Sequence, residues 1–238
     1  MKNGLSYALI AILAAGMAAV APAAPRTADD HAAVAAASGG SSTALGVSVG
    51  TLGIGGDLVQ GLGDQFNLRL NGNGGRYSYK STQRDVKYDV DLDLANAGLL
   101  LDWHPAGGEF RFTIGGFYNG NELSGEATPA KDTKIGDVEF TPAEIGTLHA
   151  KADFASAAGY AGIGFGNAVR PGGRWTVMFD LGALFYREPD FSLTSDGLAS
   201  GIPLFQQELK KEQQKIRNDY VRQATWYPVV SLGLVFRF

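Results

Sequence analysis

The chain has 238 residues, and its 20 lysines and arginines against 24 acidic residues give a net charge of −4. It contains no cysteine and no block of basic residues. This composition excludes a disulfide framework, a thiolate metal site and a charge-driven nucleic-acid interface. The length suits one all-β domain of the sandwich or the barrel kind.

The N-terminus has the pattern of a secretory signal peptide. Lys2 precedes an uncharged apolar run over residues 5–20, and Ala21-Pro22-Ala23 offers a cleavage site of small residues. We therefore predict a signal peptide over residues 1–23. No later apolar run reaches the length of about 18 residues that a membrane helix needs, so a membrane location would require a closed β-barrel.

Residues 24–43 are rich in Ala, Ser and Gly, and we predict a disordered leader there. In the segments that follow, apolar and polar residues alternate as they do in β-strands. These segments cover 44–61, 65–80, 86–103, 109–125, 151–169, 174–196 and 226–238. Short turn-forming connections and long polar connections alternate between them, as periplasmic turns and external loops do in outer-membrane barrels.

The predicted fold is all-β: a closed antiparallel transmembrane β-barrel of about eight strands over residues 44–238. Such barrels have an even number of strands, so the segments above lack one strand. The apolar phase of the first segment changes near Gly50-Thr51, which indicates either a bulge or two short strands that meet there. The 174–196 segment could instead be divided at Pro189.

The 86–103 segment also changes phase. Its apolar residues fall on even positions at Val90 and Leu92 and on odd positions at Leu99 and Leu101. A bulge near Asn96 would keep both sets facing lipid.

Residues 204–222 interrupt the strand pattern. Phe205, Leu209 and Ile216 share one face at helical spacing, and charged residues surround them. We predict an amphipathic helix on the barrel rim, on the external side that the loop lengths indicate. A lid or a partner-binding helix is the alternative.

The last segment, residues 226–238, has one apolar and one small or polar face, and it finishes on an aromatic residue. In this it resembles bacterial outer-membrane β-barrel proteins, in which a terminal Phe belongs to the signal read by the barrel-assembly machinery. The resemblance implies this role for Phe236 and Phe238.

The chain also resembles a family of small Gram-negative outer-membrane β-barrel proteins. The segments that carry the resemblance are L-L-L-D-W-H-P at 99–105, G-F-Y-N-G-N-E-L at 116–123, Y-A-G-I-G-F-G-N at 160–167 and W-Y-P-V-V-S-L-G-L-V-F-R-F at 226–238. More distantly, it is similar to the eight-stranded OmpA, OmpX and OmpW barrels. The family implies a cell outer-membrane location among outer-membrane lipids, but no agreed activity, so no functional residue is carried over.

Catalysis would need a base beside a nucleophile. His149, with Lys151 and Asp153 close in sequence, is the candidate base, but no nucleophile motif accompanies it. We predict no catalytic residue, no cofactor and no metal site. Asp89, Asp91 and Asp93 share one strand face, and their carboxylates could attract calcium. Carboxylates along an extended strand diverge, however, so we interpret this segment as a solvated external strand.

Charged residues also occur on the strand face opposite the apolar one, all near a short turn or the C-terminus. They are Asp57, Arg69, Asp102, Arg111, Asp180 and Arg237. A barrel of about eight strands is just wide enough for side chains to fill, and buried charges persist when they are paired. We expect these acids and arginines to pair and close the bore.

The predicted function is therefore a structural role, or interaction of the outer loops with an unidentified partner, for an outer-membrane barrel with a mostly filled interior. One alternative is a narrow, porin-like channel for small solutes. A second is an outer-membrane lipid-modifying enzyme.

Overall fold

The computed structural model describes residues 42–83, 85–170, 173–219 and 221–238. The predicted signal peptide and nearly all of the predicted leader lie outside the described residues. The first described strand begins at Thr43.

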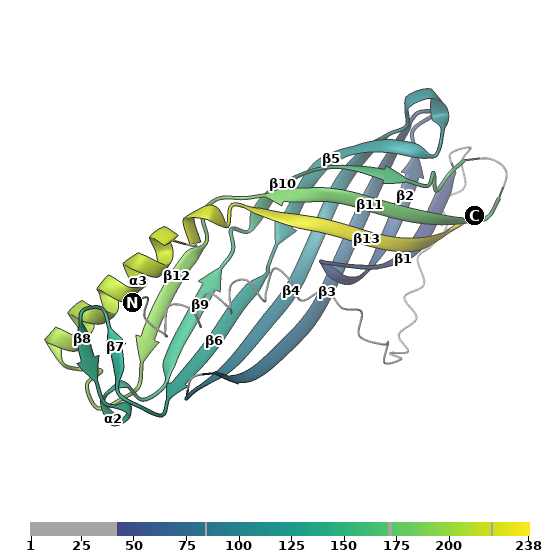
Figure 1. The fold of residues 1–238 in the computed structure, drawn as a ribbon. Helices are drawn as coiled ribbons and strands as arrows, with labels where there is room; N and C mark the ends of the chain where they lie inside the picture. Colours follow the sequence, from purple (N-terminus) through teal and green to yellow (C-terminus); the bar gives the residue numbers. More distant parts are fainter. Residues whose placement is uncertain (1–41, 84, 171–172, 220) are drawn as a thin grey trace.

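Eight antiparallel strands form a closed ring (Figure 1). Their order around the ring is β4-β3-β2-β1-β13-β11-β10-β5, and pairing of β5 with β4 closes it. The ring strands are β1 (Thr43–Gly50), β2 (Gly53–Gly61), β3 (Phe66–Gln83), β4 (Val86–Trp103), β5 (Phe110–Asn119), β10 (Ala157–Phe165), β11 (Trp175–Phe185) and β13 (Trp226–Arg237). Closure leaves no unpaired strand edge at this height.

The strand missing from the sequence analysis lies in the 44–61 segment. This segment is two strands, β1 and β2, which reverse at Thr51 and Leu52 and pair from Gly50↔Gly53 onward. Gly53 has a φ of +98°, which a residue with a Cβ rarely adopts, so glycine makes this tight reversal possible. The alternative division near Pro189 does not supply a ring strand.

Three further strands continue beyond the ring and form what we call the distal sheet. They are β6 (Glu122–Pro129), β9 (Leu148–Asp153) and β12 (Asp190–Ser195), and they extend the sheet in the order β12-β9-β6-β4-β3. β6 follows β5, β9 precedes β10, and β12 follows β11, so the distal sheet is built from the continuations of ring strands. Figure 1 shows it projecting from one end of the ring.

A helix and a small hairpin cover the distal sheet. The helix is α3 (Pro203–Asp219), which begins one residue before the helix predicted over 204–222 and ends three residues before it does. Its apolar side chains Phe205, Leu209 and Ile216 are buried in the core against the sheet. The other elements outside the ring are β7 (Thr133–Ile135), β8 (Val138–Phe140), α2 (Pro142–Ile145), η1 (Pro105–Gly107) and η2 (Val221–Gln223). Among the described residues, no helix is long and apolar enough to cross a membrane.

The two ends of the ring differ. The short connections after β2, β4 and β10 lie at the end where the chain finishes, and the distal sheet and α3 lie at the other end (Figure 1). Pairing of Ala44 with Arg237 places the start of β1 at the same end as the C-terminus. The long connections after β6 and β12 lie at the distal end, but the short β1–β2 and β3–β4 reversals lie at that end as well. The predicted alternation of short and long connections therefore matches the two ends of the ring only in part.

The predicted bulge near Asn96 is wrong. β3 and β4 pair without interruption from Gln83↔Val86 to Phe66↔Trp103. What changes is the environment of the two faces: Leu94 is 5% exposed in the distal core, whereas Leu99 is 55% exposed on the outside of the ring. In the distal sheet the apolar residues of β4 are those that point inward, and in the ring they are those that point outward. The apolar residues therefore change from even to odd positions although the strand itself is regular.

The outside of the ring is an apolar band with aromatic side chains at both ends. Trp103, Phe112 and Trp175 are exposed near the short connections, and Phe185 and Trp226 are exposed next to the distal sheet. From Trp175 to Phe185 a strand rises by roughly 33 Å at ~3.3 Å per residue. At a tilt of about 40° this corresponds to a band roughly 25 Å tall.

Candidate functional site: the interior of the ring

Five charged side chains from five ring strands meet inside the ring. Asp57 comes from β2, Arg69 from β3, Asp102 from β4, Arg111 from β5 and Asp180 from β11. Each lies on the inward face of its strand because side chains alternate across a strand. All five are buried, and Arg111 is 0% exposed. We call these five residues the charge cluster.

Arg69 contacts all three carboxylates of the cluster. Its Nη2 lies 3.0 Å from Asp102 Oδ1 and 3.1 Å from Asp180 Oδ1, and its Nη1 donates to Asp180 Oδ2 at 3.2 Å. Asp57 Oδ1 is more distant, at 3.7 Å from Nη1. The two nitrogens on Asp180 make the forked arrangement in which guanidinium and carboxylate bind most strongly.

Arg111 holds the same two acids from the opposite side. Its Nη2 donates to Asp180 Oδ1 at 2.7 Å, and its Nε lies 3.6 Å from Asp102 Oδ1. Its Nη1 also donates to the backbone carbonyls of Phe165 and Gly166. Asp102 and Asp180 therefore bridge two arginines, and this network crosses the interior.

A glycine makes room for Arg111. A Cβ at Gly164 would lie 2.8 Å from Arg111 Cζ and 2.8 Å from the carbonyl oxygen of Phe179, closer than real side chains approach. Gly164 pairs with Arg111 on one side and Asp180 on the other. Residue spacing alone predicts no specific role for this glycine, because it does not show which residue lies across the sheet.

Polar neighbours complete the charge cluster. Thr113 Oγ1 donates to Asp102 Oδ1 at 2.6 Å, Asn71 Nδ2 donates to Asp57 Oδ1 at 2.8 Å, and Ser231 Oγ lies 3.4 Å from Asp180 Oδ2. These residues were not singled out from the sequence, although they share the inward face with the charged ones. With two arginines against three aspartates, the cluster keeps one excess negative charge when all groups are ionised.

Arg237, the sixth predicted residue, is not part of the cluster. It is half-buried near the end of β13, and no ion pair joins it to a charged side chain in the described part of the chain. Ser231 is the β13 residue that pairs with Asp180, and Arg237 lies six residues further on, roughly 20 Å along the strand. Of the predicted assembly residues, Phe236 packs on Trp175 with ring centroids 4.9 Å apart, and Phe238 is exposed.

The interior is also filled on both sides of the charge cluster. Toward the C-terminal end lies a small apolar cluster of Ala44, Val59, Ala168, Val169, Met178 and Val235. His104 at this end is buried, with its ring nitrogens 3.0 Å from Asn67 Nδ2 and 3.0 Å from the Gly108 carbonyl oxygen, so it has a structural role in the turn.

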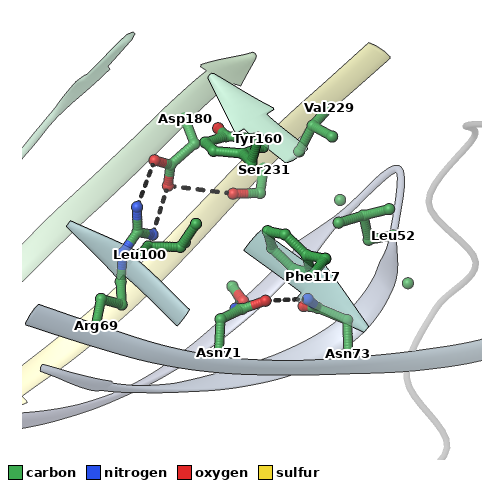
Figure 2. A pocket seen from close by; sticks show the side chains of 13 residues that line it. Leu52, Arg69, Asn71, Asn73, Leu100, Phe117, Tyr160, Asp180, Val229 and Ser231 are labelled. Atoms are coloured by element: carbon green, nitrogen blue, oxygen red, sulfur yellow. Dashed lines mark hydrogen bonds and ion pairs between the residues drawn. The ribbon is translucent and has the colours of Figure 1, made fainter. Parts of the chain in front are cut away.

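Toward the distal end lies a layer of apolar and aromatic side chains. Phe117 and Tyr160 are in contact, with ring centroids 5.7 Å apart, and Leu52, Leu100, Leu184 and Val229 pack with them. Between this layer and the charge cluster is a cavity of about 30 Å³, shown in Figure 2 with Arg69, Asp180, Asn71 and Asn73 beside it. A space of this size holds one or two water molecules.

His149, the candidate base, lies in β9 of the distal sheet rather than inside the ring. Its Nδ1 is 3.3 Å from Glu126 and its Nε2 is 3.5 Å from Asp196, so both ring nitrogens face carboxylates. Among the described residues, no serine or threonine hydroxyl is hydrogen-bonded to it. Lys151 instead bridges Glu122 and Asp153. This arrangement gives no nucleophile for the base to activate.

The row of aspartates on β4 is paired across the sheet with side chains of β3. Asp93 pairs with Arg76, Asp89 pairs with Lys80, and Asp91 accepts a hydrogen bond from Ser78. These side chains project from the solvent-facing side of the distal sheet. The aspartates therefore form cross-strand pairs rather than a converging set of calcium ligands.

Comparisons with known proteins identify the fold. No family model matches the chain, and no curated protein matches it significantly. Two solved structures of Acinetobacter baumannii proteins are similar to it. CarO2 has a TM-score of 0.60 and 24% identity over 83% of this chain and 98% of CarO2. CarO has a TM-score of 0.58 and 23% identity over 82% of this chain and 97% of CarO. The chain therefore shares its fold with CarO2 and CarO, while the predicted likeness to OmpA, OmpX and OmpW stays a prediction.

Proposed function

We propose that this chain is an outer-membrane β-barrel protein with a closed bore, in which the distal sheet and α3 form an external interaction surface. The apolar band supports the membrane location because its height of roughly 25 Å matches the lipid-facing band of outer-membrane barrels. The aromatic residues at both ends of the band match the two membrane interfaces. The signal peptide predicted for residues 1–23 belongs to this proposal.

The orientation follows from the connections. Outer-membrane barrels have short turns on the periplasmic side and long segments outside, which would place the C-terminus in the periplasm and the distal sheet outside the cell. Phe236 and Phe238 then lie at the periplasmic end, where the assembly machinery would read the C-terminal strand.

The observation that carries the closed bore is the charge cluster together with the apolar layers on both sides of it. Buried ion pairs are held in place because breaking one leaves an uncompensated charge. The distal sheet, whose core is covered by α3, is then the part of the protein that is available to partners outside the cell.

A narrow channel for small solutes is the second candidate. The cavity of about 30 Å³ beside Arg69 and Asp180, and the excess negative charge of the cluster, favour it. A polar path that admits single waters could pass a small cation if the layer of Phe117 and Tyr160 opens. An enzymatic role is not proposed, because His149 has no nucleophile hydrogen-bonded to it among the described residues.

Single-channel recording of the purified protein in planar bilayers tests the two candidates. We expect no conductance from the wild type, and Arg111→Ala to produce measurable conductance or to lower the free energy of unfolding by ~3–5 kcal/mol, the usual cost of breaking a buried pair. Lys210→Ala, on the exposed side of α3, is the control and should leave both quantities unchanged. A wild type that conducts, and that Arg111→Ala hardly alters, would favour the channel.

A further inference from the structure

One border of the distal sheet is a long strand edge without a neighbouring strand. β2 pairs with β3 only as far as Ile54↔Gly74, whereas β4 pairs with β3 as far as Gln83↔Val86. On the side away from β4, no backbone hydrogen bond joins residues 75–83 to another part of the described chain. This stretch of β3, which we call the open edge, spans roughly 30 Å at ~3.3 Å per residue.

The opposite border of the same sheet is covered. Figure 1 shows α3 beside β12, the strand at that border. Gln213 of α3 donates through Nε2 to the Phe191 carbonyl oxygen of β12 at 2.8 Å, so the helix occupies a backbone group of the border strand. Proteins protect sheet edges by such cover, by proline, by bulges or by keeping the edge strand short. The open edge has none of these, since residues 75–83 contain no proline and pair regularly with β4.

Apolar surface of the distal core is uncovered at the open edge. Tyr77 and Tyr79 lie opposite Leu92 and Val90, two buried residues of the core face of β4. Tyr77 is partly buried against that core, but Tyr79 is 55% exposed. The inward side chains of an added strand would cover Tyr79, because neighbouring strands pack their side chains in pairs. The open edge therefore offers both unpaired backbone groups and apolar surface to a partner strand.

The charged side chains of the open edge are all basic. Arg76 and Lys80 lie on its outward face, their side chains are 73% and 76% exposed, and residues 75–83 contain no acidic residue. Each is paired with an aspartate of β4, so its other side faces the position that a partner strand would take. These aspartates lie one strand further away, about 10 Å from that position, where physiological salt screens exposed charges. Charge complementarity therefore favours an acidic partner and disfavours a second copy of the same basic edge.

We infer that the open edge binds an extended acidic segment of another protein, which adds to the distal sheet as a further strand. In this mode of recognition, main-chain hydrogen bonds supply affinity and alternate side chains supply specificity. Apolar side chains of the segment cover Tyr77 and Tyr79, and its acidic side chains form cross-strand pairs with Arg76 and Lys80. The inference rests on the proposed function and deepens it, because it identifies the part of the distal sheet that a partner outside the cell contacts.

A synthetic peptide of alternating glutamate and valine, added to the folded mature protein in detergent, tests the inference. We expect it to bind at least about fivefold more tightly than a peptide of alternating lysine and valine, because lysines would oppose Arg76 and Lys80. Hydrogen-exchange mass spectrometry should show protection in residues 75–83 and none in β12. The variant Arg76→Gln, Lys80→Gln should weaken binding of the glutamate peptide about fivefold. The matched control Lys134→Gln, Lys210→Gln, which changes exposed lysines of β7 and α3, should bind as the wild type does.

Methylation of the peptide backbone separates strand addition from attraction between charges alone. Successive N–H groups of a strand point to opposite sides, so methylating the valine nitrogens blocks one side of the peptide and methylating the glutamate nitrogens blocks the other. Only one side of the peptide can pair with the open edge. We therefore expect one of the two methylated peptides to lose binding and the other to keep it.

The outcomes that overturn the inference are distinct. They are equal binding of the glutamate and lysine peptides, equal binding of the two methylated peptides, and protection confined to residues other than 75–83. Wild-type dimers that the glutamate peptide dissociates would show that a second copy occupies the open edge, and would also overturn it. Location is checked separately, because an impermeant maleimide should label Thr82→Cys in intact cells. A protein that binds the glutamate peptide but is not labelled there would support the inference and contradict the proposed orientation.

Discussion

At the scale of single residues, the absence of a side chain at Gly164 leaves room for the ion pairs of Arg111. Gly164 lies between Arg111 and Asp180 in the ring, and the Arg111 guanidinium passes directly over it. A Cβ at this position would lie 2.8 Å from both that guanidinium and the backbone carbonyl of Phe179, so both must shift. The network of two arginines and three aspartates therefore depends on a residue that has no charge.

We expect Gly164→Ala to lower the free energy of unfolding by ~1–3 kcal/mol, the usual cost of an overpacked interior. Urea titration followed by the heat-modifiable gel shift measures this. Gly72→Ala is the matched control, because Gly72 is also in a ring strand and an added Cβ there meets no atom within 4 Å. Equal stability of the two variants would show that Arg111 moves aside without cost.

The inward face of each strand could be predicted from the sequence, but depth in the ring could not. Alternation correctly placed Arg69, Asp102 and Asp180 on one side of their strands. It also placed Arg237 on the inward face of β13, yet Arg237 lies beyond the apolar residues that close the C-terminal end. Depth depends on the register between strands, and β13 follows a long connection, so no tight turn fixes its register with β11.

At the scale of elements, β4 shows why the sequence pattern was misinterpreted. When apolar residues change from even to odd positions along a strand, a bulge is the ordinary explanation. That explanation assumes that each face of the strand has the same environment along its whole length. Here one continuous strand passes from a core that lies inside a sheet to an apolar surface that lies outside a ring. The change from buried Leu94 to exposed Leu99 thus marks the boundary between the distal core and the outer surface of the ring.

Glu208 joins α3 to the β7–β8 hairpin. Glu208 Oε1 accepts from Lys211 Nζ at 2.7 Å, and its Oε2 accepts from the Asp137 backbone N–H at 2.7 Å. These two hydrogen bonds hold the pKa of the Glu208 carboxyl below its usual value. The lowered pKa means that the bonds stabilise the fold above the usual glutamate pKa, and that this stabilisation is lost as the pH falls through the folded-state value.

We expect Glu208→Gln to increase amide hydrogen exchange in α3 and in residues 133–140 at pH 7. The difference from the wild type should shrink once the pH falls below the lowered folded-state pKa of Glu208, because the wild-type carboxyl is then protonated too. Hydrogen-exchange mass spectrometry, corrected for intrinsic rates, gives the comparison. Glu139→Gln, an exposed glutamate of the same hairpin, is the control and should change nothing. A difference that persists at low pH would contradict this explanation.

At the scale of the whole molecule, the proposed orientation makes the two ends of the ring accessible from different compartments. The chain has no cysteine, so a single introduced thiol reports its own location. Gln214 is exposed on α3, and Asp64 is exposed in the short connection between β2 and β3. Neither residue forms part of the charge cluster.

We expect an impermeant maleimide to label Gln214→Cys in intact cells, because α3 lies outside the cell in the proposed orientation. Asp64→Cys should be labelled only after the outer membrane is opened. The reverse pattern would invert the topology, and labelling of both in the soluble periplasmic fraction would contradict the membrane location. Both variants should keep wild-type gel mobility, which shows that they are folded.

The continuous hairpin of β3 and β4 has a mechanical consequence. These strands run through the ring and on into the distal sheet with no linker between the two, and three other ring strands also continue into that sheet. The distal sheet therefore cannot swivel on the barrel in the way that a tethered domain does. In the proposed orientation, a partner that binds the distal sheet outside the cell would also fix the tilt and rotation of the barrel in the lipid.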